Sequence, residues 1–245
     1  MDNTIYSATT GMIARQKSMN ITGNNIANLE TNGYKRSQAV YDTFAEYLVY
    51  RKDGQSTEVG NSSRGVIIND IYTSFEQGPI ANTGKALDFA LDGFGFFTIE
   101  SAAGGQYMLT RDGRFTVDAE GFLKNLYGDY VLGQNGRIFV GNNAVTVDEQ
   151  GNIFIGGNVI DSFLITVPDA AEGMQMLSNG LIAYVGGTEA FAGRILQGCL
   201  EKSNVNLIDE MTTMLADARA FQACSQLIKA EDELNRKTVT ELAKV

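Results

Sequence analysis

The chain has 245 residues, long enough to bury a sizeable core, and its 27 glycines against 2 prolines indicate a part rich in β turns. Its formal net charge of −10 argues against a nucleic-acid partner, because neutralising phosphates requires clustered lysine and arginine. The absence of histidine removes the commonest general base and metal ligand, and the two cysteines are too few for a disulfide framework.

Residues 3–29 are predicted to form a long N-terminal helix. Apolar side chains recur seven residues apart, which is the spacing of a seam between paired helices. The repeat consists of Ile5, Met12, Met19 and Ile26, with Ala8, Arg15, Thr22 and Leu29 in the companion positions. Because several of these residues are small or polar, the seam is weak. Gly33, in the sequence TNG, predicts a left-handed turn at the end of this segment.

Residues 36–85 are predicted to form a connector that runs extended away from the helices. Its first part is typical of a short helix or strand, residues 54–63 are predicted to form a polar loop, and residues 66–75 a strand.

Residues 86–190 are predicted to form an antiparallel β domain, because short aromatic and β-branched runs alternate with Gly, Asn or Asp. The sequence TVDxxG occurs twice and predicts two hairpins, with Gly121 and Gly151 in the left-handed position. An alternative is calcium binding by the acids of these repeats, but the alternating oxygen ligands of a calcium loop are missing. Those acids are Asp118, Glu120, Asp148 and Glu149.

Residues 191–245 are assigned to a C-terminal helix whose start Asn204 or Asn206 can cap. It repeats the heptad spacing with Leu207, Met214, Phe221 and Ile228, and Met211, Ala218 and Ser225 are the companions. A second apolar line indicates contact with more than one neighbour. This line consists of Ile208, Leu215, Leu227 and Leu234.

The predicted fold class is therefore α+β, with residues 1–35 and 191–245 pairing as a coiled coil around the central β-rich domain. The first residues contain no uninterrupted apolar region, so no cleaved secretory signal is expected. No run of about 20 apolar residues predicts a membrane span. We expect no cofactor and no metal, and we interpret Cys199 and Cys224 as small buried hydrophobes.

Four long stretches of the chain resemble the flagellar basal-body rod protein family, within the rod and hook group of axial proteins. The N-terminal stretch is NNIANLETNGYKR at residues 24–36, and the C-terminal one is LEKSNVNLIDEMTTMLADARAFQACSQLIKAEDE at residues 200–233. The central ones are LDFALDGFGFFTI at residues 87–99 and LTRDGRFTVDAEGFL at residues 109–123. Within the family, EMTTMLADARAF resembles the proximal rod subunit and GMIARQ the distal one; the proximal type is favoured and the distal type is the alternative.

The resemblance implies a subunit of a tubular rod, built from other copies of this chain and neighbouring rod proteins. It also implies export by the flagellar type III apparatus without a cleaved signal, and a location in the rod between the cytoplasmic membrane and the outer layers. The expected assembly interface comprises Ile5, Met12, Met19, Asn24, Asn25, Ile26, Asn28, Leu207, Met211, Met214, Phe221 and Ile228. The three asparagines are expected to bond neighbouring subunits or backbone and so fix the register of the helices.

Two other function classes are alternatives to an assembly subunit without chemistry. A secreted glycan-acting enzyme would need a carboxylate pair, for example Asp112 with Asp118 or Glu120, but these acids lie in turn sequences. An adhesin would use the β domain as a binding module. Polymerisation through the chain ends favours the first class, and turnover or glycan binding by the isolated middle favours the others.

Overall fold

The computed structural model describes residues 2–43, 46–52, 56–63, 65–102, 104–169, 173–177 and 180–242. The chain divides into two compact units. Unit 1 consists of Met1–Ala27, Arg36–Ser74 and Asn206–Val245, and unit 2 of Asn28–Lys35 and Phe75–Val205. Residues 28–35 therefore belong to unit 2, although the chain on both sides of them belongs to unit 1.

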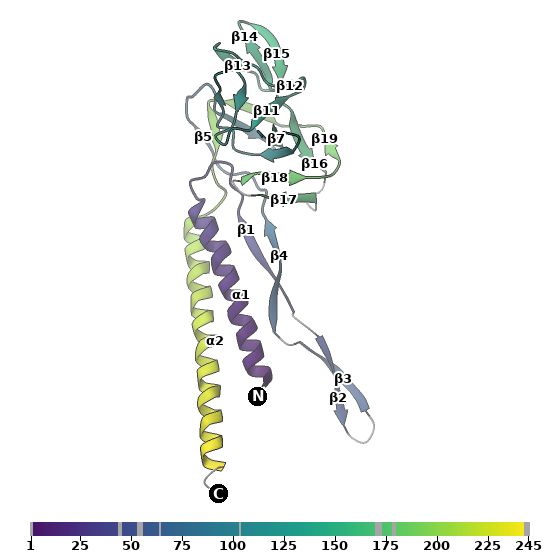
Figure 1. Ribbon diagram of the computed structural model, residues 1–245, viewed down its shortest axis with the longest axis vertical. Helices are drawn as coiled ribbons and strands as arrows, with labels where there is room; N and C mark the ends of the chain where they lie inside the picture. The colour runs from purple at the N-terminus through teal and green to yellow at the C-terminus, as the bar shows by residue number, and fades with distance from the viewer. Residues whose placement is uncertain are drawn as a thin grey trace. The chain divides into compact units, whose positions relative to one another are not determined.

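Unit 1 contains the two long helices, α1 (Asp2–Ala27) and α2 (Leu207–Leu242), which lie side by side and antiparallel (Figure 1). The predicted pairing of the terminal helices is thus confirmed. Asn206 caps α2, because its side-chain oxygen accepts a hydrogen bond from the Ile208 amide at 3.1 Å. Asp209 and Glu210 follow in the first turn, where acids interact favourably with the helix dipole.

The connector forms a long two-part hairpin instead of an extended segment with a polar loop. Strand β1 (Ser37–Thr43) pairs with β4 (Val66–Thr73), and β2 (Glu46–Lys52) pairs with β3 (Ser56–Ser63), both antiparallel. Strands β1 and β4 contact α1 and do not run away from the helices (Figure 1). The sequence of β3, STEVGNSS, lacks the apolar alternation of a half-buried strand, which is why the sequence predicted a loop there.

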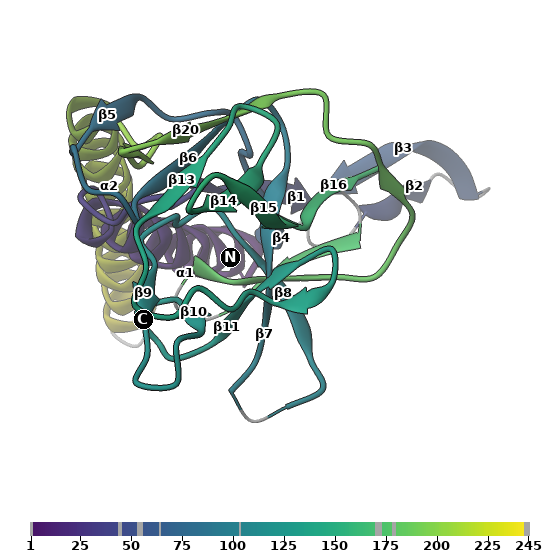
Figure 2. The same cartoon turned by 90° about the horizontal axis from the view of Figure 1, so that it is seen from above.

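Unit 2 is an antiparallel β structure, as the sequence predicts (Figure 2). Its main sheet has the order β17-β18-β8-β7-β11-β10-β9, and β16 also pairs with β7. Its strands are β5 (Ile80–Asn82), β6 (Phe89–Asp92), β7 (Phe96–Glu100), β8 (Tyr107–Thr110), β9 (Thr116–Val117), β10 (Leu123–Lys124), β11 (Tyr130–Gly133), β12 (Gly136–Arg137), β13 (Val145–Val147), β14 (Asn152–Ile155), β15 (Asn158–Ser162), β16 (Ile165–Pro168), β17 (Met174–Met176), β18 (Ile182–Tyr184), β19 (Thr188–Glu189), β20 (Arg194–Gln197) and β21 (Cys199–Glu201).

Four buried phenylalanines form the centre of the unit 2 core: Phe89, Phe97, Phe115 and Phe163. The centroids of the Phe89 and Phe163 rings lie 5.1 Å apart, and those of Phe97 and Phe115 5.2 Å apart in an edge arrangement. Such geometry adds to the stabilisation from burial. Ile195 of β20 belongs to the same cluster, so the strands just before α2 complete this core.

The two TVDxxG stretches form hairpin turns, as predicted. The side-chain oxygen of Asp118 accepts bonds from the amides of Glu120 and Phe122, and Asp148 does the same for Gln150 and Asn152. Gly121 and Gly151 have φ angles of 93° and 92°, in the region that favours glycine. The aspartates therefore satisfy turn amides, and no group of acids in the described part of the chain is arranged to hold a metal ion.

Candidate assembly interface

The contact between α1 and α2 is lined by small residues on the α1 side. Ala8, Ala14, Ser18 and Thr22 are all buried there. A Cβ added to Gly11 would lie 3.5 Å from the sulfur of Cys224, which places these two residues face to face. Small side chains let the two helix backbones approach closely, but they bury little apolar surface.

On the α2 side, the most deeply buried residues of this contact are two acids. Glu210 pairs with Arg36 at 2.5 Å, and Asp217 pairs with Arg15 at 2.8 Å. The pKa of Arg15 is raised: its burial acts in the opposite direction, but the hydrogen bond and charge of Asp217 outweigh it. Buried charges require such partners, so these two pairs fix how α1, α2 and the start of β1 fit together.

Asn25 is 1 % exposed and joins three elements of unit 1. Its amide nitrogen donates to the Ser37 carbonyl at 2.7 Å and to Glu210 at 3.0 Å, and its oxygen accepts from the Ser37 amide at 3.1 Å. The expected bond from an asparagine to backbone is therefore made within the chain. Asn28 accepts from the Thr31 hydroxyl at 3.1 Å in the turn that follows α1.

A cavity of about 240 Å³ lies beside these pairs, and its lining includes Arg15, Arg36, Glu210 and Asp217. One oxygen of Asp217 is buried without a hydrogen-bond partner among the described residues. The four charged side chains that line the cavity are already paired, Arg15 with Asp217 and Arg36 with Glu210. These pairs hold α1, α2 and the start of β1 in register.

The predicted interface residues fall into three groups by exposure. Asn25 is buried; Asn24, Leu207 and Met211 are exposed; the remaining ones are half-buried, namely Ile5, Met12, Met19, Ile26, Asn28, Met214, Phe221 and Ile228. The sequence predicts that Met211 faces the helix contact, but Met211 is exposed in the structure. The buried positions of α2 in this contact are Glu210 and Asp217 instead. Sequence reasoning missed them because acids at heptad positions are normally solvent-facing; the signal that could have found them is Arg15 at a seam position of α1.

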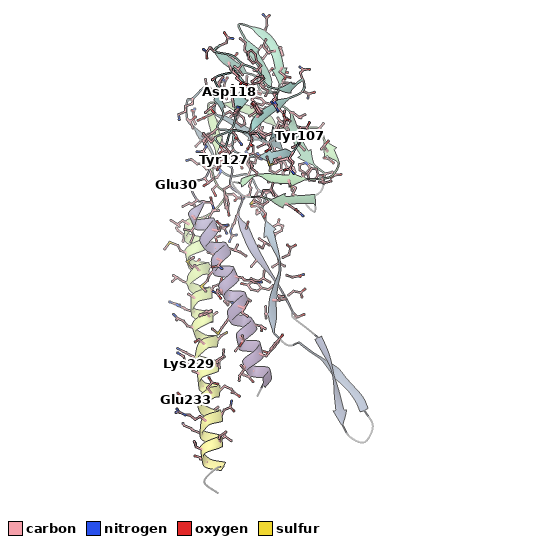
Figure 3. All side chains as sticks on the ribbon, in the orientation of Figure 1. Glu30, Tyr107, Asp118, Tyr127, Lys229 and Glu233 are labelled. Carbon is pink, nitrogen blue, oxygen red and sulfur yellow. The ribbon has the colours of Figure 1, made fainter. Side chains whose placement is uncertain are left out.

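Several large apolar side chains of α2 are exposed in the described part of the chain. Ile208, Met211 and Leu215 follow the helical spacing of a single face and are 71 %, 52 % and 58 % exposed. The other exposed apolar residues of α2 are Leu207, Leu227, Leu234 and Val239. Charged side chains such as Lys229 and Glu233 project from the same helix (Figure 3). Ile208, Met211 and Leu215 are here called the α2 outer face, and two of them, Ile208 and Leu215, belong to the second apolar line that the sequence predicts.

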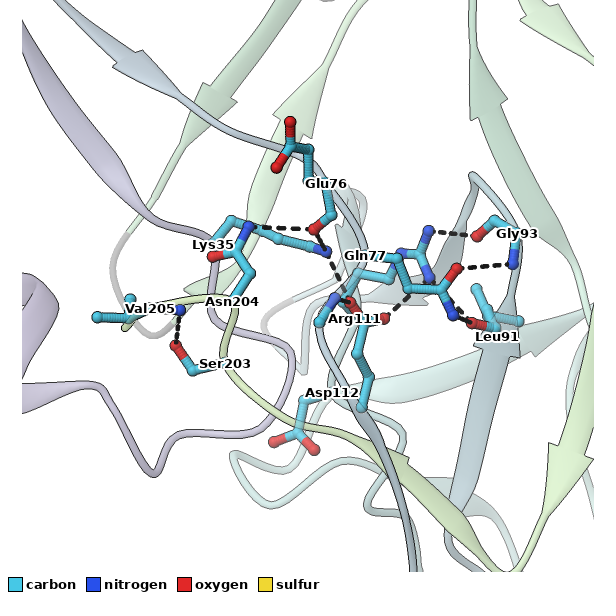
Figure 4. A network of polar contacts seen from close by, with 12 residues as sticks. Lys35, Glu76, Gln77, Leu91, Gly93, Arg111, Asp112, Ser203, Asn204 and Val205 are labelled. Atoms are coloured by element: carbon cyan, nitrogen blue, oxygen red, sulfur yellow. Dashed lines mark hydrogen bonds and ion pairs between the residues drawn. The ribbon is translucent and has the colours of Figure 1, made fainter. Parts of the chain in front are cut away.

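Unit 2 contains a buried charge cluster that joins three separate stretches of sequence (Figure 4). One oxygen of Glu201 accepts from the Lys35 ammonium at 2.7 Å, and the other accepts from the Arg111 guanidinium at 2.9 Å. Burial lowers the pKa of Lys35 and of Arg111, although Glu201 acts in the opposite direction on both. The cluster thus pairs two cations, Lys35 and Arg111, with the single carboxylate of Glu201.

Gly33 lies beside this cluster and has a φ angle of 69°, as the predicted left-handed turn requires. Its amide donates to the Glu201 carbonyl at 2.9 Å. A Cβ at this position would lie 2.5 Å from the carbonyl carbon of Arg111, closer than real contacts allow. Glycine is thus needed here both for conformation and for space.

The chain pairs its two ends as helices and forms an antiparallel β unit in its middle. Three family models match it: Flagella basal body rod protein over residues 5–35, Flagellar hook protein FlgE/F/G D1 domain over residues 90–184, and Flagellar basal body rod FlgEFG protein C-terminal over residues 196–241. No described helix is both long and apolar enough to cross a membrane.

Curated relatives match over nearly their whole length. The flagellar basal-body rod protein FlgF of Caulobacter vibrioides is 30 % identical over 251 residues, covering 100 % of both chains. FlgG of Bacillus subtilis is 30 % identical over 270 residues, and FlgF of Rhizobium meliloti 30 % over 248, each covering 98 % of both chains. The chain therefore belongs to the flagellar basal-body rod protein family of FlgF and FlgG, a structural and non-enzymatic family, and is a rod subunit of the flagellar basal body.

Proposed function

We propose that this chain is a rod subunit of the proximal type that polymerises through its paired terminal helices. Its partners are other copies of itself and neighbouring rod proteins, and the flagellar type III apparatus exports it without removing a signal. The family supports assembly with rod proteins. The order of elements, with both chain ends in one helical unit, supports contacts made by that unit.

The observation that carries the proposal is the α2 outer face. Its apolar side chains lie in water in the single chain, and burial of each against another subunit would contribute up to about 1.5–3 kcal/mol. A contiguous exposed apolar surface of this kind is typical of a protein–protein contact. The inner side of α2 is already occupied by α1, so the outer face is the part that remains available to a neighbour.

A double substitution at Met211 and Leu215, both to glutamate, tests this role. These residues are exposed, so the single chain is expected to keep its fold, whereas two buried charges at a subunit contact would prevent polymerisation. The matched control is Ala216→Glu, at an exposed position that is neither three nor four residues from Met211 or Leu215. The measurements are swimming, export of the subunit into the medium and the presence of rods in purified basal bodies. Normal rods in the Met211/Leu215 double variant would rule out the α2 outer face as the contact.

The choice of the proximal type rests on the stretch EMTTMLADARAF, which resembles the proximal rod subunit. FlgF and FlgG relatives both match at about the same identity, so the subtype needs a separate test. Expression of this chain is expected to restore swimming to a strain that lacks the proximal subunit and not to one that lacks the distal subunit. The reverse result would assign it to the distal type.

Export without removal of a signal is tested separately. Mass spectrometry of the exported chain is expected to find the N-terminal residues intact.

A further inference from the structure

Residues Asn28–Lys35 pack into unit 2 as a short segment, here called the strap. Its last four residues, Asn32 to Lys35, are all buried. The Gly33 amide donates to the Glu201 carbonyl at 2.9 Å, and the Lys35 ammonium donates to the Glu201 carboxylate at 2.7 Å. The Lys35 ammonium also donates to the Glu76 carbonyl at 2.6 Å (Figure 4). The Asn204 amide also donates to the Tyr34 carbonyl at 3.4 Å, so polar contacts and the burial of Tyr34 together hold the strap.

The docked strap also carries two energetic costs. The side-chain oxygen of Asn32 is buried without a hydrogen-bond partner among the described residues, and leaving such a group unpaired is unfavourable. Lys35 adds a second cation to a buried site that has a single carboxylate. Release of the strap into water would remove both costs at once.

Unit 2 keeps its own charge balance when the strap leaves. Glu201 retains Arg111, whose guanidinium also donates to the carbonyls of Leu91 and Gly93 at 3.2 and 2.5 Å. Arg111 lies in addition over the Phe96 ring, 5.3 Å from its centroid. None of these contacts involves the strap, so its release leaves no unpaired charge in the interior of unit 2.

We propose that residues 28–35 are a releasable strap, which undocks from unit 2 as a cooperative segment while the β structure of unit 2 stays folded. The unequal partners of Glu201 make this possible, because Arg111 is a fixed partner and Lys35 a detachable one. Undocking frees the segment that follows α1 directly, and it does not depend on contacts between copies.

The charge on Lys35 gives the strap a defined pH dependence. The groups that face its ammonium are Glu201, Arg111 and Glu76, and burial nevertheless lowers the pKa of Lys35 below its ordinary 10.5. The docked strap therefore binds this proton less tightly than the released strap does. Docking is consequently favoured as the pH rises through the folded pKa towards 10.5, and it is disfavoured at lower pH.

Hydrogen exchange of the full chain tests the strap directly. Protection is compared between peptides that cover residues 28–36 and peptides that cover β7, after correction for the intrinsic exchange rate. Tyr34→Ala removes the largest apolar contact of the strap and is expected to lower its protection about a hundredfold or more, with β7 unchanged. Tyr107→Ala, a matched truncation at a side chain that is 68 % exposed, is expected to change neither.

Lys35→Met provides the second measurement. In the unsubstituted chain, protection of the strap is expected to rise as the pH increases through the lowered pKa of Lys35 towards 10.5, and this rise is expected to disappear in Lys35→Met. If Tyr34→Ala lowers the protection of the strap and of β7 equally, the proposal is overturned, because the strap then opens only when unit 2 unfolds. An unfolded Lys35→Met chain would overturn it as well, and neither result bears on the α2 outer face.

Discussion

Units 1 and 2 of this subunit are held together by different interactions. Unit 2 has a dense aromatic core in which Phe89 and Phe97 are completely buried. In unit 1 the buried residues between the helices are small or charged, and the acids Glu210 and Asp217 take places where an ordinary helix pair has leucine. Hydrophobic burial therefore stabilises the β unit, whereas paired charges determine the register of the helices.

This difference fits the demands on each part of a rod subunit. A β unit with its own core can keep its structure whatever its neighbours are. A helix pair with little apolar burial gains less than the about 1–2 kcal/mol per residue that ordering the backbone costs. We therefore expect the helix pair to be less stable than unit 2 in the free subunit and to gain stability when the α2 outer face is covered during assembly.

The largest expected effect concerns the boundaries of the β unit. A fragment of residues 87–185, which lies within the β domain of residues 86–190 that the sequence predicts, lacks Ile195 of the core and leaves Arg111 without Glu201. A fragment of residues 75–205 contains both. We expect a dispersed amide NMR spectrum from residues 75–205 and a collapsed one from residues 87–185. Equal dispersion in both would show that β20 and β21 are not needed for folding.

A large but local effect is expected inside the core. Phe97→Ala removes a completely buried ring that contacts Phe115 and Phe163, and it should lower the free energy of unfolding of unit 2 by about 3–5 kcal/mol. Phe139→Ala is the matched control, because this ring is 54 % exposed. Urea unfolding of the 75–205 fragment measures both. A loss below about 1 kcal/mol for Phe97→Ala would mean that the aromatic cluster does not dominate the stability of unit 2.

The same contrast explains what the sequence could and could not predict. The period-seven apolar pattern predicted the paired helices, and the short aromatic and β-branched runs between turn residues predicted the β unit, because both report burial. They carry no information on charges that are buried in pairs, which is why Glu210, Asp217 and Glu201 were missed. The partners Arg36 and Lys35 lie more than 160 residues away in sequence from Glu210 and Glu201. Only the fold brings such groups together.

The hairpin of the connector was missed for a related reason. Strands β1 and β4 expose Val40, Ile71 and Tyr72, so neither strand shows the clean alternation that marks a half-buried sheet. Their pairing and their contact with α1 are tertiary interactions. Gly33, in contrast, was predicted correctly, because the left-handed conformation is a local property of the chain.

A moderate effect is expected from breaking a buried pair in unit 1. Arg36→Met leaves the buried Glu210 with the Asn25 amide, and we expect unit 1 to lose about 1–3 kcal/mol, a range that allows for the partial exposure of Arg36. The double variant Arg36→Met/Glu210→Met should regain part of this loss, because no unpaired charge remains. Thermal unfolding of the helices by circular dichroism reports both. A double variant less stable than Arg36→Met would show that Glu210 stabilises by more than its pairing.

The smallest expected effect is the pH dependence contributed by the Asp148 turn of unit 2. Burial acts to raise the pKa of this carboxyl, but hydrogen bonds from the Asn152 side chain and from turn amides outweigh it, so the pKa lies below its ordinary 3.8. The folded state therefore binds the proton less tightly than the unfolded state. The stabilisation by this carboxylate is fully present above about pH 4 and is lost as the pH falls through the folded pKa.

Asp148→Asn should make unit 2 less sensitive to acid over this range of pH. Glu149→Gln, which neutralises the neighbouring exposed acid, should leave the acid sensitivity unchanged. Urea midpoints of the 75–205 fragment between pH 2.5 and pH 6 measure the difference. Parallel midpoint curves for Asp148→Asn and the unsubstituted fragment would show that the turn tolerates a protonated aspartate, and that the acid sensitivity of unit 2 arises elsewhere.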